Sequence, residues 1–125
     1  MGAAAVLMVC ASLTVVDGDT VKCDGQLLRD MGDGAPNVSG YDTAEIGPRA
    51  KCVAEQQAGE QAAARMRELI ATPGLTIENS GKRDVYDRPL VVLRLPDGTT
   101  IGHHMIEEGY ARVWTPGYVA DWCSG

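Results

Sequence analysis

The sequence predicts an α+β, mainly β domain: a small Greek-key barrel with two helices packed against it. The first third of the chain alternates apolar and polar residues in short runs separated by Asp-Gly turns, which is typical of hairpin strands. One long helical pattern follows, and then further short strands and a second helical pattern. A chain of 125 residues, 45% of them hydrophobic, suggests one domain with one core. We place this domain at residues 12–115, between an apolar segment (1–11) and a short tail (116–125).

The first predicted hairpin turns at Asp17-Gly18-Asp19. Glycine adopts positive φ without steric cost, so this turn can pair residues 12–16 with residues 20–24. A second turn at Asp24-Gly25 leads into a third strand over residues 26–31. Both carboxylates of the first turn would then lie at the mouth of a hairpin. Taken alone, such a turn is most simply interpreted as solvated.

The rest of the chain supplies a loop, two helices and three strands. Apolar residues recur at helical spacing over residues 53–71, and Pro73-Gly74 ends that helix. Gly109 closes a second, shorter helix at its C-terminal cap. In chain order we predict a loop at 32–41, a helix at 53–71, a strand at 75–78, a turn at 79–81, a strand at 89–95, a helix at 101–108 and a strand at 110–114. This order is typical of the OB-fold architecture.

Charge and the N-terminal residues limit the partners and the location of the chain. A net charge of −6 repels nucleic acid at long range. A polyanionic substrate must therefore be held by local arginines or by a bound cation. The apolar run at residues 3–11 is too short to span a membrane and is similar to the tail of a signal-peptide core, although no Lys or Arg precedes it. We therefore expect a secreted or periplasmic protein without stable membrane association. Alternatively, the apolar run leads directly into the first strand.

The four cysteines show no Cys-x-x-Cys spacing, which argues against a zinc site. Disulfides or buried thiols remain, and four cysteines allow three pairings. In the predicted barrel the start of the long helix packs near the end of the second strand. A disulfide between Cys23 and Cys52 is therefore one expectation, and an ordinary buried thiol at Cys23 is the alternative. Cys10 and Cys123 could pair only if the two ends of the chain meet.

Six motifs in a fixed order carry a family resemblance. They are Val16-Asp17-Gly18-Asp19-Thr20, Leu28-Arg29, Asp42-Thr43-Ala44-Glu45, the alanine-rich helix, Tyr86-Asp87-Arg88-Pro89-Leu90 and Ile106-Glu107-Glu108-Gly109-Tyr110-Ala111-Arg112-Val113. With these motifs the chain resembles the staphylococcal nuclease (thermonuclease-like) family from about residue 13 to about residue 114. The resemblance implies a five-stranded OB-fold Greek-key barrel and calcium-dependent hydrolysis of the phosphodiester bonds of DNA and RNA.

The resemblance also implies roles for eight residues. Two carboxylates and one backbone carbonyl would bind Ca²⁺, another acid would lie near the metal, a glutamate would act as general base, and two arginines would bind phosphate. The implied calcium ligands are Asp19, Asp42 and the carbonyl of Thr43; the nearby acid is Asp17; the catalytic residues are Glu45, Arg29 and Arg88; and Tyr86 lies beside the nucleotide.

These residue types also suit the roles on chemical grounds. Calcium prefers hard oxygen ligands and tolerates irregular geometry, so carboxylates from two separate segments can share one ion. A carboxylate can take a proton from an attacking water molecule. Guanidinium groups bind phosphate bidentately, which lysine cannot do. The sequence therefore predicts a monomeric, calcium-dependent endonuclease whose partner is a nucleic acid.

Two other functions stay open at this point. The loop at residues 32–41 is long for the family, Ala44 stands where proline is common, and Asp87 stands where glycine is usual. Together with the acidic charge, these departures favour an OB-fold module that has lost catalysis and binds nucleic acid or protein. The other possibility is a structural exported domain that binds calcium for stability.

Overall fold

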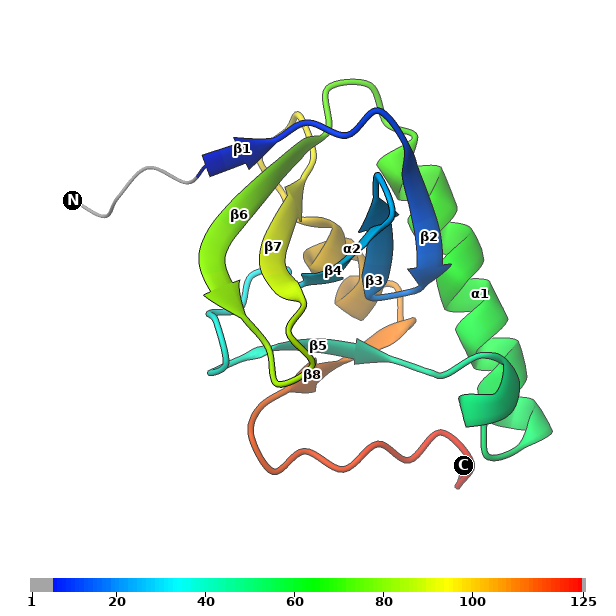
Figure 1. Cartoon of the computed structure of the whole chain (residues 1–125). Helices are drawn as coiled ribbons and strands as arrows, with labels where there is room; N and C mark the ends of the chain where they lie inside the picture. The colour runs from blue at the N-terminus through cyan, green and yellow to red at the C-terminus, as the bar shows by residue number, and fades with distance from the viewer. Residues whose placement is uncertain (1–5, 125) are drawn as a thin grey trace.

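The computed structural model describes residues 6–124 (Figure 1). The chain forms strands and helices in the order β1 (Val6–Met8), β2 (Leu13–Asp17), β3 (Thr20–Cys23), β4 (Gln26–Asp30), β5 (Gly40–Thr43), a 3₁₀ turn η1 (Gly47–Arg49), α1 (Val53–Ile70), β6 (Thr76–Arg83), β7 (Pro89–Arg94), α2 (Ile101–Glu107) and β8 (Ala111–Trp114). The predicted α+β, mainly β class is confirmed. Both helices lie where the sequence places them, within about a residue at each end.

The strands form two sheets. One has six strands in the order β1-β6-β7-β4-β3-β2, and the other pairs β5 with β8. Neighbouring strands of the large sheet are antiparallel except β4 and β7, which pair in parallel. The five strands expected of the barrel occur in the order β2-β3-β4-β7-β6, but within the described residues no ladder joins β2 to β6. The sheet is therefore OB-like, which confirms the predicted OB-fold class, and the described strands do not close into a complete barrel.

Strands β1 and β5 were not predicted as separate elements. Strand β1 lies in the apolar N-terminal segment, whose residues 1–5 fall outside the described part of the chain, and it pairs with the edge of β6 rather than with β2. Strand β5 begins at the end of the predicted loop and pairs with β8. Each has only three or four residues, too few to show an alternating pattern. Their partners lie far away in the sequence, as in Val6↔Asn79 and Thr43↔Ala111.

Of the three turns predicted around glycine, one forms as expected, one forms without positive φ at its glycine, and one is absent. The Asp24-Gly25 turn forms as expected, with positive φ at both residues. In the Asp17-Gly18-Asp19 turn, Gly18 does not have a positive φ. Glycine is needed there for another reason: a Cβ at this position would lie 2.7 Å from Ala62 Cβ and from Thr43 Cγ2. Close approach of α1 and β5 therefore requires this glycine. The turn predicted at 79–81 is wrong, because β6 runs on through it to Arg83, with a register shift against β7.

The core lies between the sheet and the two helices. Helix α1 runs alongside β2 (Figure 1) and buries Ala62, Ala63, Met66 and Leu69. Small side chains on this face let α1 approach closely. At Gly59 a Cβ would lie 2.6 Å from the carbonyl oxygen of Glu45 and 2.9 Å from that of Ala44. Helix α1 therefore fixes the backbone that follows β5. No helix within the described residues has the length and apolar character needed to cross a membrane.

The disulfide pairing differs from the expected bridge. Cys10 pairs with Cys23, and Cys52 pairs with Cys123. The predicted Cys23–Cys52 bridge is wrong because Cys23 ends β3 at the opposite end of the sheet from the start of α1 (Figure 1). The prediction also treated residues 1–11 and 116–125 as peripheral. In the structure the segment after β1 returns to Cys23, and the C-terminal tail returns to Cys52.

We predict that Gly59→Ala destabilises the protein by about 1–3 kcal/mol, the usual cost of overpacking. The new methyl group would push into the Ala44 and Glu45 carbonyls, although alanine normally favours a helix over glycine by about 1 kcal/mol. Urea denaturation measures the change. The control is Gln57→Ala on the exposed face of the same helix, which should stay within about 0.5 kcal/mol of the parent. A Gly59→Ala variant as stable as this control would contradict the packing argument.

Candidate active site

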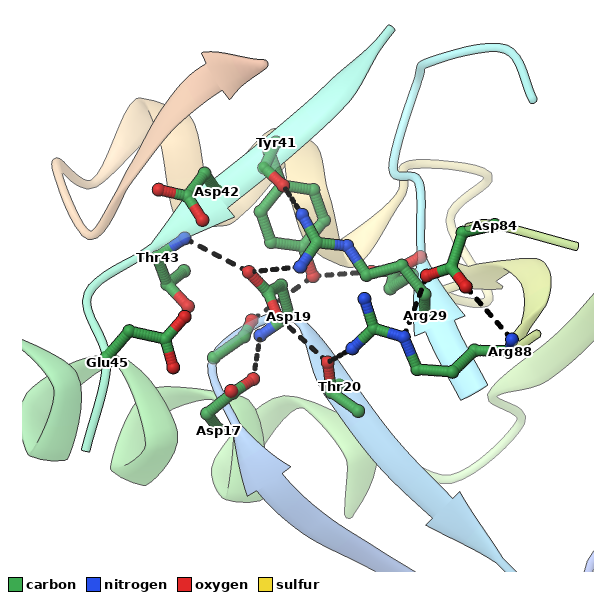
Figure 2. Close-up of polar contacts among 12 residues, drawn as sticks. Asp17, Asp19, Thr20, Arg29, Tyr41, Asp42, Thr43, Glu45, Asp84 and Arg88 are labelled. Atoms are coloured by element: carbon green, nitrogen blue, oxygen red, sulfur yellow. Dashed lines mark hydrogen bonds and ion pairs between the residues drawn. The ribbon is translucent and has the colours of Figure 1, made fainter. Parts of the chain in front are cut away.

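One cleft of about 540 Å³ gathers most of the residues singled out in the sequence. It lies where the β2–β3 hairpin, β4, β5 and the turn between β6 and β7 meet (Figure 2). The predicted residues that line it are Asp17, Asp19, Arg29, Asp42, Glu45, Tyr86 and Arg88. The eighth, Thr43, is buried beside it and donates its backbone N–H to the Asp19 carboxylate at 3.2 Å. The β2–β3 turn is therefore not a solvated turn.

An ion pair between Asp19 and Arg29 forms the floor of the cleft. Asp19 Oδ2 and Arg29 Nη1 are 2.7 Å apart, and Asp19 is only 3% exposed. The pair follows from strand register, because Thr20, next to Asp19, lies opposite Arg29 in the β3–β4 ladder. The other Arg29 terminal nitrogen donates to the Tyr41 carbonyl on β5. Burial lowers the pKa of Arg29, but the neighbouring Asp19 carboxylate and other acidic groups raise it by more, so the guanidinium stays charged.

Beneath this pair, Asp30 and Tyr41 form a buried hydrogen-bond network. The Tyr41 hydroxyl donates to Asp30 Oδ2 at 2.7 Å, and Asp30 Oδ1 accepts backbone N–H groups of Gly32 and Leu93, each at 3.1 Å. Asp30 is fully buried. Burial raises the pKa of Asp30 to about 6, although the hydrogen bonds from Tyr41 and the two backbone groups act in the opposite direction. The network ties β4, β5 and β7 together behind the cleft.

Three further carboxylates face the cleft around Asp19. Burial, followed by the Asp19 charge, raises the pKa of Asp17 to about 8 and that of Asp42 to about 6. The same two causes raise the pKa of Glu45. Burial and the Asp19 charge thus disfavour the ionised forms of these three carboxyl groups, and a cation bound among them would favour ionisation.

The oxygen donors in this cluster have the chemistry that a hard divalent cation prefers. The buried side-chain oxygen Thr43 Oγ1 has no hydrogen-bond partner within the described part of the chain, and it belongs to the residue whose backbone N–H binds Asp19. Among the described residues, no three His, Cys, Asp or Glu side chains lie close enough to hold a metal ion as they stand. The residues fit calcium in type, and the carboxylates would have to draw together around it.

Arg88 enters the cleft from the turn between β6 and β7. Its Nε donates to Asp84 Oδ2 at 2.7 Å, and its Nη1 donates to Thr20 Oγ1 at 3.3 Å (Figure 2). The guanidinium carbon also lies 5.3 Å from the centre of the Tyr86 ring. Tyr86 itself is 77% exposed, so one face of the cleft carries an accessible aromatic side chain. These contacts orient Arg88 without filling all of its N–H donors.

The structure also identifies residues near the cleft that the sequence analysis missed. Glu55 on α1 is buried and accepts the backbone N–H groups of Glu45 (3.3 Å) and Lys51 (2.9 Å), so it shapes the segment that carries Glu45. Its position three residues after the helix cap Cys52 is a capping-box signal that could have indicated it. Trp122 donates its indole N–H to Asp42 Oδ2 at 3.4 Å. No sequence signal points to that contact.

Comparison with known families gives one match. A family described as staphylococcal nuclease homologue matches residues 37–121, more than half of the chain. The match includes Asp42, Thr43, Glu45, Tyr86 and Arg88, and it begins after the turn that carries Asp19 and the strand that carries Arg29. Among curated proteins, none matches the chain.

We predict that Asp30→Asn flattens the dependence of stability on pH. Asp30 binds its proton more tightly in the folded protein (pKa about 6) than in the unfolded chain (ordinary value 3.8), so its contribution is present at low pH and lost as pH rises through 6. About two pKa units correspond to about 3 kcal/mol. Asparagine can keep the Gly32 and Leu93 bonds through its carbonyl oxygen.

Denaturation of parent and variant between pH 4 and pH 7 measures this difference directly. Asp17 and Asp42 contribute slopes of the same sign to both proteins, so the difference between the two curves isolates Asp30. Asp87→Asn, whose side chain is 85% exposed, is the control and should keep the parent slope. Parallel curves for parent and Asp30→Asn would contradict the assignment.

Proposed function

Because the chain belongs to the staphylococcal nuclease homologue family, we propose that it is a calcium-dependent endonuclease that hydrolyses phosphodiester bonds of DNA, RNA or both by attack of water. The main support is the cleft. It brings both predicted arginines, the four predicted carboxylates and an exposed tyrosine together from separate segments of the chain. A nuclease needs all three kinds of group within the span of one phosphodiester and its neighbouring base.

In this proposal Arg29 and Arg88 bind the scissile phosphate. Both are already oriented by carboxylates, Arg29 by Asp19 and Arg88 by Asp84, with N···O distances of 2.7 Å. A planar guanidinium can keep such a contact and still offer donors to phosphate oxygens, because it has five N–H groups. Two fixed guanidinium groups also stabilise the charge that grows on the phosphate in the transition state. The chain is acidic as a whole, so these local arginines must supply most of the attraction.

Asp19, Asp42 and the carbonyl of Thr43 would hold the calcium ion, with Asp17 as an acid beside it. A bound Ca²⁺ would offset negative charge at the phosphate and polarise a phosphoryl oxygen. The accumulation of raised carboxylate pKa values around Asp19 supports a cation at this place rather than another anion. The protein's own part is to keep the donors facing one another across the β2–β3 turn and β5.

Glu45 would act as the general base. Its carboxylate lines the cleft, and burial and the Asp19 charge raise its pKa toward the range in which a base works well at neutral pH. The backbone of Glu45 is fixed by Glu55 and by the close approach of Gly59. Among the described residues, the Glu45 side chain makes an ion pair with the largely exposed Arg49 at 3.8 Å, a weak contact that leaves the carboxylate able to turn toward a water molecule.

A second candidate is an OB-like module that binds nucleic acid without cutting it. Specific observations favour it: both arginines already have carboxylate partners, and the acids of the described residues are not drawn together into a metal cluster. Either function fits an oxidising environment, which the two disulfides indicate. We propose export to the cell exterior or the periplasm.

A cleavage assay separates the two functions. The parent protein should cut a labelled single strand of DNA or RNA when millimolar calcium is present, and a chelator should abolish cutting, since the carboxylates alone do not offset charge on the phosphate. Gel analysis of the products measures the reaction. Retention of the intact strand in a mobility-shift assay, with no cleavage at any calcium concentration, would support the binding module instead.

We predict that Glu45→Gln lowers kcat by about 10²–10⁴-fold, the usual contribution of a general base. Arg88→Lys should lower kcat/KM by about 10²-fold, because lysine loses the bidentate fork while keeping the charge. Both should melt within a few degrees of the parent. Arg67→Ala, on the exposed face of α1 and away from the cleft, is the control. If either active-site variant cleaves at the parent's rate, the catalytic role proposed for that residue is wrong.

A further inference from the structure

The C-terminal tail returns to the cleft after β8. It runs back beneath β8 and β5 toward the start of α1 (Figure 1), where Cys123 is bonded to Cys52 with a Cα–Cα distance of 6.1 Å. Cys52 is the N-cap residue of α1. The tail is thus attached covalently to the segment that follows the proposed calcium ligands and general base.

Trp122, next to the disulfide, is held on two sides. Its ring lies 4.0 Å from the guanidinium carbon of Arg112, and Arg112 Nη1 donates to the carbonyl of Asp121 at 2.6 Å. Arg112 lies opposite Asp42 in the β5–β8 ladder. The indole N–H of Trp122 donates to Asp42 Oδ2 at 3.4 Å. The ring therefore covers the strand pair that carries Asp42 and makes one directed contact with its carboxylate.

This contact matters because Asp42 has few others. Asp19 has an arginine, a hydroxyl and a backbone N–H to fix its carboxylate. Among the described residues, two groups of the tail face the Asp42 carboxylate: the buried Tyr118 hydroxyl lies beside it, and the Trp122 indole N–H makes the directed hydrogen bond. Hydrogen bonds from outer residues orient metal-binding carboxylates and set their affinity.

We propose that Trp122, held by the Cys52–Cys123 disulfide and by Arg112, is a positioning residue for Asp42: it fixes one oxygen so that the other faces the cleft and a calcium ion. This inference rests on the proposed function, because it assigns the tail a part in the same calcium site. Trp122 does not touch the substrate. It acts through Asp42, and the disulfide keeps the tail where the indole can reach that carboxylate.

The test compares Trp122→Phe with the parent by calorimetric titration with calcium. Phenylalanine keeps a ring over Arg112 and loses the N–H. Calcium affinity should fall about 10-fold or more, the effect typical of removing an outer hydrogen bond. The calcium concentration for half-maximal cleavage should rise by the same factor, while kcat at saturating calcium changes by less than about threefold. Val119→Ala, an exposed residue of the same tail, is the control and should bind calcium as the parent does.

A second variant tests the covalent attachment. Cys52→Ser with Cys123→Ser removes the disulfide but keeps an N-cap oxygen for the Glu55 N–H, so α1 keeps its cap. The calcium affinity of this double variant should also fall. In its NMR spectrum, the Trp122 indole N–H resonance should shift toward that of a free indole. This variant decides the question if Trp122→Phe does not fold.

The outcomes distinguish this inference from the proposed function. If the parent binds calcium and folded Trp122→Phe binds it equally well, the positioning role is overturned and the nuclease proposal stands. If the parent binds calcium without cleaving any strand, the nuclease proposal fails, and the affinity comparison still decides the role of Trp122. If the parent binds no calcium, both are overturned.

Discussion

The buried pair of Asp19 and Arg29 is the interaction on which the rest of the site depends. It joins the β2–β3 turn to β4, and each partner also reaches β5, Asp19 through the Thr43 N–H and Arg29 through the Tyr41 carbonyl. Removing one member of a buried pair leaves an uncompensated charge and typically costs about 3–5 kcal/mol. The pair therefore holds three segments of the cleft in register, and the same two groups are those that a phosphate and a cation would engage.

Burial and mutual repulsion of four carboxyl groups are the main constraint that the site imposes on the fold. Asp17, Asp42 and Glu45 lie around Asp19 in partial burial, and each has a raised pKa. Hydrogen bonds and strand pairing must offset this repulsion in the absence of a ligand. Close packing at two glycines also holds these segments in place: Gly18 lets α1 and β5 meet the hairpin, and Gly59 lets α1 meet the Glu45 backbone. Under the proposed function, this cost in stability would be offset when a cation binds.

Local features of this fold could be predicted from sequence, and non-local ones could not. The β2–β3–β4 strands, α1 and α2 depend on nearby periodicity and turn residues, and the structure has them where expected. Strand β5, the open edge of the sheet and the disulfide pairing depend on which distant segments meet. For example, Tyr41 is buried because β5 pairs with β8 about seventy residues later, which no local pattern encodes. The order of the sequence motifs predicted the residues that line the cleft. Glu55 and Trp122 were missed because their contacts form only in the folded chain.

The two disulfides divide the chain into covalent rings. Cys10–Cys23 closes a small ring around the first hairpin, while Cys52–Cys123, with a sequence separation of 71, closes one that contains α1, β6, β7, α2 and β8. The turn between β6 and β7 lies inside the large ring and exposes Val85 and Tyr86 almost fully, which makes it an accessible place for a protease. A single cut there would open the ring without releasing a fragment. Arg88, at the end of that turn, would stay tethered by the Cys52–Cys123 disulfide to the half of the cleft that carries Asp19 and Asp42.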